Sequence, residues 1–122
     1  MKASQNQIES ANTNPGATSE FLALLESGNE LRIRLRGQLN LDNHSNLREL
    51  LEEVLNRTEQ PLIILDMSGV SSIASSAFGA LVDFARRSFL KQRTLILDNL
   101  SPDCERVLDL LRLRPLFNVN QN

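Results

Sequence analysis

Two short, uninterrupted apolar runs constrain the fold of this chain more than any other feature. The first begins at Pro61 and reads PLIILDM, and the second begins at Thr94 and reads TLILDN. Each run has the length of a β-strand, and neither alternates between apolar and polar residues, which is typical of strands covered on both faces. Such strands belong in the middle of a sheet.

Segments with helical periodicity precede and follow these runs. Their apolar residues recur three and four positions apart, as on a helix that packs against a core. The residues predicted to face inward are Leu47, Leu50, Leu51, Val54 and Leu55, then Phe78, Leu81, Val82, Ala85 and Phe89, then Cys104, Val107, Leu108 and Leu111. Ser101 is the predicted N-cap of the last helix, with Pro102 in its first turn.

The region before the first run predicts an arm and two strands. Residues 1–19 are rich in Asn, Ser, Thr and Gln, so we expect a flexible N-terminal arm. The segment FLALLESGNELRIRLRG then reads as two strands around a turn at Ser27, Gly28 and Asn29. The resulting order is strand, strand, helix, strand, helix, strand, helix. Joined by right-handed crossovers, these units predict an α/β domain with a mainly parallel sheet.

Arginines occupy every second position of the second predicted strand. Arg32, Arg34 and Arg36 alternate with leucine and isoleucine, so one face of the strand is apolar and the other basic. A basic stripe can bind an anion, but Glu26 and Glu30 lie close by in the sequence. We therefore favour a solvated strand face over an anion site.

Length and composition exclude several classes of function. A chain of 122 residues fits one domain, and its net charge of −2 lacks the basic surface that nucleic acids or anionic membranes attract. There is no Trp or Tyr to stack on bases. The single cysteine, Cys104, cannot form an internal disulfide, and no secretory signal is apparent, so the predicted location is the cytoplasm. We expect neither nucleic acid nor a membrane as a partner.

The residues that enzymes use are too few to assemble an active site. The only histidine, His44, lies at the start of a predicted helix in a polar segment, so Ser75 or Ser76 has no evident base to make it a nucleophile. Asp66 and Asp98 each follow a buried strand, where they are expected to cap its end. No metal-ligand spacing or phosphate-binding loop occurs, so we predict no enzyme activity, no catalytic or metal site and no cofactor.

A serine cluster remains unexplained by these arguments. Ser71 and Ser72 are expected in the turn after the first apolar run, and Ser75 and Ser76 in the N-cap region of the next helix. No charged residue lies between Asp66 and the next acid in the sequence, Asp83. Because a helix N-terminus accommodates negative charge, a phosphate here would be tolerated by the fold and would dominate the neutral surface.

The segment LIILDMSGVSSIASSAFGALVDFARRSF resembles the central signature of the STAS family, typified by the bacterial anti-sigma factor antagonists. LRIRLRGQLN and LILDNLSPDCERVLDLLRLRPLF are similar to the family's second strand and to its last strand and closing helix. The resemblance implies a single STAS-like α/β domain over residues 20–119, with a mainly parallel, four- to five-stranded mixed sheet packed with connecting helices.

The same resemblance implies a function for the serine cluster. Ser75 matches the serine that a partner serine kinase, itself the anti-sigma factor, phosphorylates in the family, and a metal-dependent serine phosphatase reverses the reaction. The implied partner-binding residues are Asn40, Ser75, Ser76, Phe78, Gly79 and Val82. Ala74 and Ala77 stand where the family usually has Asp and Gly. The alternative is a STAS scaffold, or an accessory subunit of a signalling or transporter assembly, that is never phosphorylated.

Overall fold

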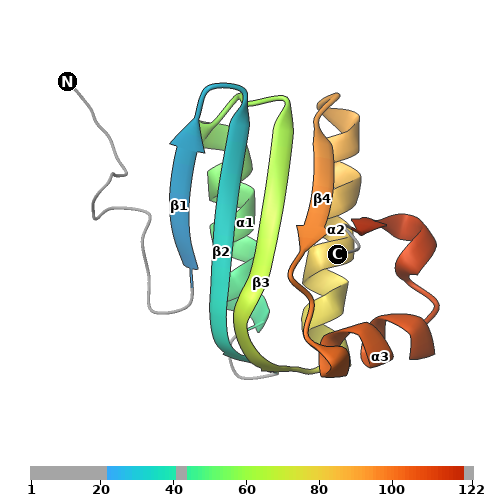
Figure 1. Ribbon diagram of the computed structural model, residues 1–122. Helices are drawn as coiled ribbons and strands as arrows, with labels where there is room; N and C mark the ends of the chain where they lie inside the picture. The colour runs from blue at the N-terminus through green and yellow to red at the C-terminus, as the bar shows by residue number, and fades with distance from the viewer. Residues whose placement is uncertain (1–21, 41–43, 120–122) are drawn as a thin grey trace.

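The computed structural model describes residues 22–40 and 44–119 and shows one α/β domain (Figure 1). Its elements in chain order are β1 (Leu22–Ser27), β2 (Glu30–Leu39), α1 (His44–Arg57), β3 (Leu62–Ile73), α2 (Ser75–Leu90), β4 (Thr94–Asp98), α3 (Pro102–Leu110), the 3-10 helix η1 (Arg114–Leu116) and β5 (Asn118–Val119). The predicted arm, residues 1–19, lies outside the described residues, so the domain boundary at residue 20 stays a prediction.

The five strands form one mixed sheet in the order β1-β2-β3-β4-β5. β1 and β2 pair antiparallel through the tight turn at Gly28 and Asn29, where Gly28 has a φ of 60°. β2, β3, β4 and β5 are parallel neighbours, with β3 at the centre. The predicted fold class is therefore confirmed, and the two-residue β5 is the fifth strand of the expected four to five.

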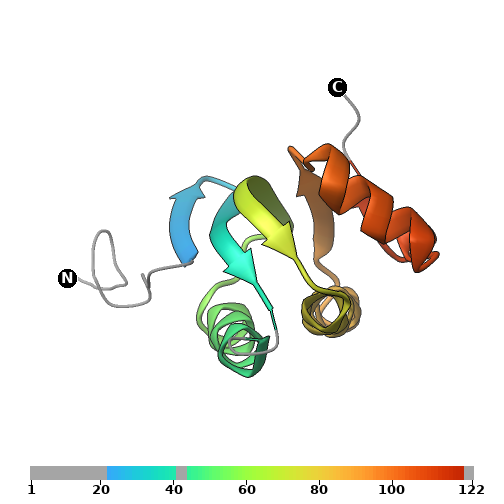
Figure 2. The same cartoon turned by 90° about the horizontal axis from the view of Figure 1, so that it is seen from below.

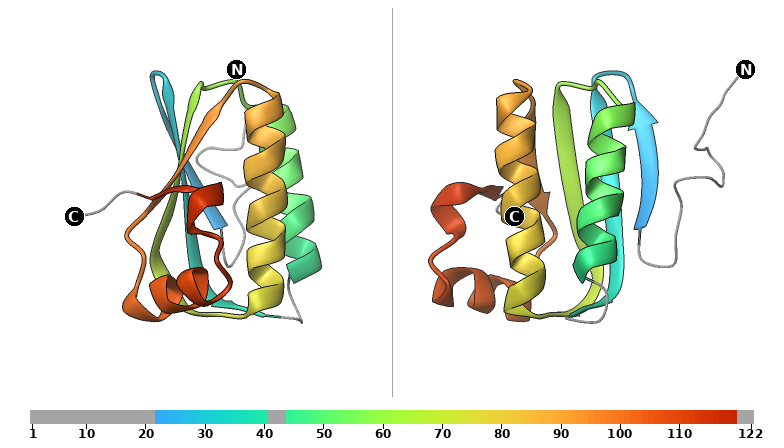
Figure 3. Two further views of the ribbon diagram at one scale, coloured as in Figure 1. Left: turned by 90° about the vertical axis from the view of Figure 1, so that its right-hand side faces the viewer. Right: turned by 180° about the vertical axis from the view of Figure 1, so that it is seen from behind.

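Two helices cover one face of this sheet. α1 and α2 lie side by side against it, while α3 lies on the opposite side, beyond β3 and β4 (Figures 2 and 3). Alternate residues of the central strands, such as Ile33, Leu65 and Leu97, are fully buried beneath α1 and α2. On the other face Ile64 is only half-buried. The expected double coverage of β3 is thus complete on one face and partial on the other.

The core-facing stripes of two helices differ from the prediction. In α2, Phe84 is buried and Phe89 is 78% exposed, so the inward placement of Phe89 was wrong. The buried stripe of α2 instead continues from Leu81 through Phe84 to Ser88, so Phe89, next to Ser88 in the last turn, faces outward. In α3, Cys104 and Leu108 are buried as expected, but Leu111, which follows the helix as its C-cap, is exposed, so its inward placement is wrong.

β3 is longer than the apolar run that predicted it. It continues through Ser71 and Ser72 to Ile73, so the expected turn at these serines is wrong. The extension is possible because β2 also continues beside it, with two register shifts. At one of them Gly69 lies so close to β2 that a Cβ would sit 2.9 Å from Arg36 Cβ. This irregular part of the β2–β3 pair carries the chain from the sheet into α2.

Candidate functional site: the start of helix α2

The chain passes from β3 into α2 through a single residue, Ala74. Ala74 is the N-cap, with an extended backbone (φ −86°, ψ 155°) and no side-chain hydrogen bond to the helix. Ser75 and Ser76 are therefore the first two residues of α2, and neither one caps it. The N-cap role that Ser101 fulfils in α3, by accepting a hydrogen bond from the Cys104 amide at 3.1 Å, has no counterpart here.

Ser75 presents an exposed polar side chain at the start of α2. Its side chain is exposed, and its hydroxyl has no hydrogen-bond partner among the described residues. The first turn of α2 contains no acidic residue. Because the first amides of a helix lack intrahelical acceptors and carry its positive dipole end, this position suits an added negative charge. Chemically, Ser75 offers an exposed hydroxyl at a position that tolerates added negative charge.

The structure also brings Asn40 to this end of the sheet. The Ala74 amide donates a 2.7 Å hydrogen bond to the Leu39 carbonyl, which joins the end of β2 to the start of α2. Asn40 follows Leu39 directly, and Ser75 follows Ala74. Two predicted site residues that are distant in the sequence therefore lie at one place in the fold.

The other predicted partner-binding residues differ in exposure. Gly79 is exposed and Val82 is half-buried, on the outer side of α2. Ser76 is half-buried, and its Oγ is enclosed without a hydrogen-bond partner. Phe78 is fully buried in the core. The side chain of Phe78 thus packs in the core beneath α2 and is not exposed on the surface of the helix.

An ionic cluster marks the end of the neutral part of α2. Asp83 lies 2.9 Å from both Arg86 and Arg87 of its own helix and 3.3 Å from Arg48 of α1. Burial alone would raise the pKa of Asp83, but hydrogen bonds and charge from these arginines lower it. The uncharged surface that begins at Ser75 therefore ends at a carboxylate whose charge is already compensated.

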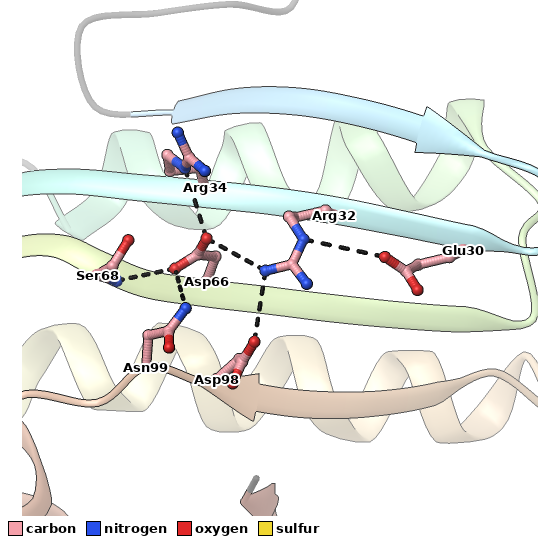
Figure 4. Close-up of polar contacts among 7 residues, drawn as sticks. All are labelled: Glu30, Arg32, Arg34, Asp66, Ser68, Asp98 and Asn99. Carbon is pink, nitrogen blue, oxygen red and sulfur yellow. Dashed lines mark hydrogen bonds and ion pairs between the residues drawn. The ribbon is translucent and has the colours of Figure 1, made fainter. Parts of the chain in front are cut away.

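A second polar cluster lies on the opposite face of the sheet (Figure 4). Asp66 of β3 and Asp98 of β4 are paired directly across the strands, and Arg32 of β2 lies 3.2 Å and 3.4 Å from their carboxylates. Asp66 also lies 3.5 Å from Arg34 and accepts a hydrogen bond from Asn99 at 3.1 Å. The predicted solvated face is therefore wrong for Arg32, which pairs with both acids. Asp98 ends β4 as expected, whereas Asp66 lies within β3 and not at its end.

This network keeps Asp66 ionised. Asp66 is only 2% exposed, and burial alone would raise its pKa. Hydrogen bonds from Ser68, Asn99 and Arg32 outweigh burial and lower the pKa to about 2. A carboxylate held so far below neutral pH is a poor general base. Within the described residues no group of three potential metal ligands occurs. The cluster therefore joins three neighbouring strands through ion pairs and hydrogen bonds.

Only part of the Asp66 cluster was detectable in the sequence. Both apolar runs end in Asp at the same point, as LIILD and LILD, and arginines alternate along β2. The sequence pattern does not indicate the register in which β2, β3 and β4 pair. Only the pairing of Asp66 with Asp98, and of Arg34 with Asp66, shows that these charges meet.

A comparison with protein families decides the wider assignment. The family model described as STAS domain matches residues 22–122. The chain belongs to the STAS family. The match includes every described helix and strand, and within the described residues no helix of this STAS domain is long and apolar enough to cross a membrane.

Solved structures share the fold of this STAS domain at low sequence identity. An anti-sigma factor antagonist from Mycobacterium paratuberculosis is 14% identical with a TM-score of 0.73, and the match covers 83% of this chain and 85% of that one. The unphosphorylated antagonist SpoIIAA is 22% identical with a TM-score of 0.68, covering 83% and 89%. The phosphorylated form of SpoIIAA from Bacillus is 22% identical with a TM-score of 0.62, covering 83% and 92%.

Proposed function

We propose that this STAS domain is a partner-switching regulator of the anti-sigma factor antagonist type. It binds a serine kinase that is also an anti-sigma factor, the kinase phosphorylates Ser75, and the phosphate ends the binding. A metal-dependent serine phosphatase removes the phosphate and restores binding. The observation that carries the proposal is the exposed Ser75 hydroxyl, without a partner among the described residues, at the first position of α2.

The physical basis of the switch is the different cost of a phosphate in two environments. In the free protein, a phosphate on Ser75 adds about −1.5 to −2 charges at the positive end of α2, where the helix dipole favours it by about 0.3–1 kcal/mol. At a desolvated interface the same unpaired charge costs several kcal/mol, and about 4 kcal/mol corresponds to a thousandfold loss of affinity. Phosphorylation thus weakens binding without unfolding the domain.

The proposed binding face is the neutral surface around Ser75. It comprises Asn40 at the end of β2 and Ser76, Gly79 and Val82 on α2, and Asp83 marks its limit. Phe78 was predicted to belong to this face, but its burial restricts it to supporting α2 from the core. An uncharged, half-apolar helix surface is one that a partner can cover at low desolvation cost.

The solved relatives support this type of function. SpoIIAA, an anti-sigma factor antagonist of the same fold, is known in both an unphosphorylated and a phosphorylated form. A Ser→Glu variant of RsbS from Moorella thermoacetica shares the fold with a TM-score of 0.68. By analogy, we infer that this chain also acts by binding rather than by catalysis and works in the cytoplasm of a bacterium to regulate transcription.

The test compares three substitutions in the serine cluster. Ser75→Ala keeps the neutral surface, Ser75→Asp adds a charge at the switch position, and Ser71→Asp adds the same charge to an exposed serine of β3. Each variant is immobilised to capture the cognate kinase, which is then purified and titrated calorimetrically. We expect Ser75→Ala and Ser71→Asp to bind like the unmodified protein and Ser75→Asp to lose about a thousandfold in affinity. Equal binding of Ser75→Ala and Ser75→Asp contradicts the proposal.

One observation favours the alternative of a STAS scaffold or an accessory subunit of a signalling or transporter assembly. Ala74 provides no carboxylate beside Ser75 and no side-chain cap for α2. A kinase that recognises an acid at this position would not act on the chain. In that case Ser75 carries no phosphate under any growth condition, and the surface around α2 binds its partner permanently.

A further inference from the structure

The two edges of the sheet differ in how they are protected. β5, at one edge, has only two residues. β1, at the other edge, has six residues that pair with β2 in unbroken register, without a bulge. Among the described residues no strand pairs with the outer side of β1. Within residues 22–40 and 44–119, one long, regular edge is therefore left without a pairing strand.

The composition of β1 makes this edge suited to pairing. Natural proteins protect exposed edges with charges, prolines, bulges or very short strands. β1 begins with the apolar residues Leu22, Ala23, Leu24 and Leu25, contains no proline, and carries its only charge near its end, at Glu26. Leu25 is 63% exposed. The usual protective features are missing where the strand is most apolar.

We propose that β1 pairs with β1 of a second copy of this chain, antiparallel and across a two-fold axis, so that one continuous sheet runs through both copies. A two-fold axis between the two strands, perpendicular to the sheet, pairs β1 of one copy antiparallel with β1 of the other. Both copies therefore use the same surface in the contact. In antiparallel pairing the two Glu26 carboxylates lie at opposite ends of the contact and do not repel each other. The apolar residues of the two strands meet across it.

The chain preceding β1 is a poorer candidate for covering this edge. Residues 1–19 are rich in Asn, Ser, Thr and Gln and contain the pair Pro15-Gly16. They lack the alternating apolar residues that a strand beside Leu25 would contribute. A second copy supplies those residues in the correct spacing.

The dimer leaves the proposed switch accessible. β1 is one edge of the sheet, whereas α2 lies behind β4, toward the opposite edge (Figures 1 and 3). The edge contact and the surface around Ser75 are therefore separate. Either proposal can fail while the other holds.

The test measures the oligomeric state of the full chain. Sedimentation velocity over a wide concentration range is expected to show a reversible monomer–dimer equilibrium in the micromolar range. Leu25→Lys places a charge on the exposed side of the edge, and we expect it to weaken dimerisation about tenfold or more. The matched control is Leu110→Lys, a substitution at a residue of α3 that is 78% exposed, which should leave the equilibrium unchanged.

Hydrogen exchange locates the contact independently of the substitutions. The amides of β1 should exchange more slowly as the protein concentration rises, while those of α3 should not change. A protein that remains monomeric at every concentration overturns the proposal, even if its β1 amides are protected, because the edge is then covered from within the chain. A dimer that Leu25→Lys leaves intact, or that Leu110→Lys weakens equally, also overturns it.

Discussion

Arg32 and Asp66 lie 34 positions apart in the sequence, and their side chains are joined by a 3.2 Å ion pair between β2 and β3. The same guanidinium group lies 3.4 Å from Asp98 of β4, which is paired directly opposite Asp66. Two carboxylates that face each other on neighbouring strands would repel. Arg32 lies against both carboxylates and offsets this repulsion, so it helps the middle of the sheet to carry its two acids.

Replacing Asp66 by Asn should lower the stability and change its pH dependence. Because the pKa of Asp66 is lowered in the folded protein, from an ordinary 3.8 to about 2, its ionisation stabilises the fold above pH 3.8. This contribution is lost as the pH falls from 3.8 to about 2. We expect Asp66→Asn to cost about 2 kcal/mol at neutral pH and to flatten the acid limb of the stability curve.

Urea unfolding between neutral pH and pH 2 measures both effects. The control is Glu53→Gln, which breaks an exposed pair with Arg57 in α1 and should change the stability by less than about 0.5 kcal/mol. An Asp66→Asn protein as stable as the wild type, with an unchanged acid limb, would show that the network contributes nothing.

Two Gly→Ala substitutions should have opposite effects on stability. A Cβ at Gly69 would meet Arg36 Cβ at 2.9 Å and the Leu35 carbonyl oxygen at 3.0 Å, so Gly69→Ala must push β2 and β3 apart at a cost of about 1–3 kcal/mol. A Cβ at Gly79 meets nothing within 4 Å, and alanine is the better helix former. Gly79→Ala should therefore stabilise the domain by about 0.5–1 kcal/mol. Thermal unfolding of both variants checks the order; two changes of the same sign would refute it.

Arg93 is a buried cation whose hydrogen bonds hold the end of α1. Its guanidinium group donates to the carbonyls of Gln60 (2.7 Å), Leu55 (3.2 Å) and Thr58 (3.1 Å) and to the Thr58 hydroxyl (2.9 Å). Burial lowers the pKa of Arg93, and the nearby charge of Glu59 raises it.

Arg93→Met should leave these oxygens without a donor and destabilise the domain by about 2–4 kcal/mol, as measured by denaturant unfolding. The control, Arg57→Met, removes an exposed arginine that lies 3.0 Å from Glu53, and should cost less than about 0.5 kcal/mol. If the two variants unfold at the same denaturant concentration, the Arg93 contacts do not hold the helix end.

The fold was predictable because its signals are local and repeated. The apolar runs after Pro61 and Thr94 and the periodic helices between them fix the order of strands and helices, and Ser101 caps α3 as its sequence context indicates. The predictions that are wrong concern positions whose burial or secondary structure is determined by contacts with residues distant in the sequence. The exposure of Phe89 depends on which side of the last turn of α2 faces the core, where Ser88 is buried instead. The strand at Ser71 depends on the continuation of β2 beside it.

The candidate site was predictable only in part for the same reason. The accessible serine at Ser75 follows from the helix that begins there, but its N-cap is Ala74, because β3 continues up to the helix. Asn40 is brought to the site by a backbone hydrogen bond between Ala74 and Leu39. A backbone contact does not depend on side-chain identity, so the sequence pattern does not indicate it. The charge network of Arg32 depends on strand register and was therefore not anticipated.

The most direct test of the proposed switch is the phosphorylation state of Ser75. Tandem mass spectrometry of the tryptic peptide from Thr58 to Arg86, isolated from growing and from stressed cells, covers the whole serine cluster. We predict phosphate on Ser75, with an occupancy that differs between the two conditions. A fully sequenced peptide without phosphate in both conditions, or with phosphate only on other serines, would contradict the account.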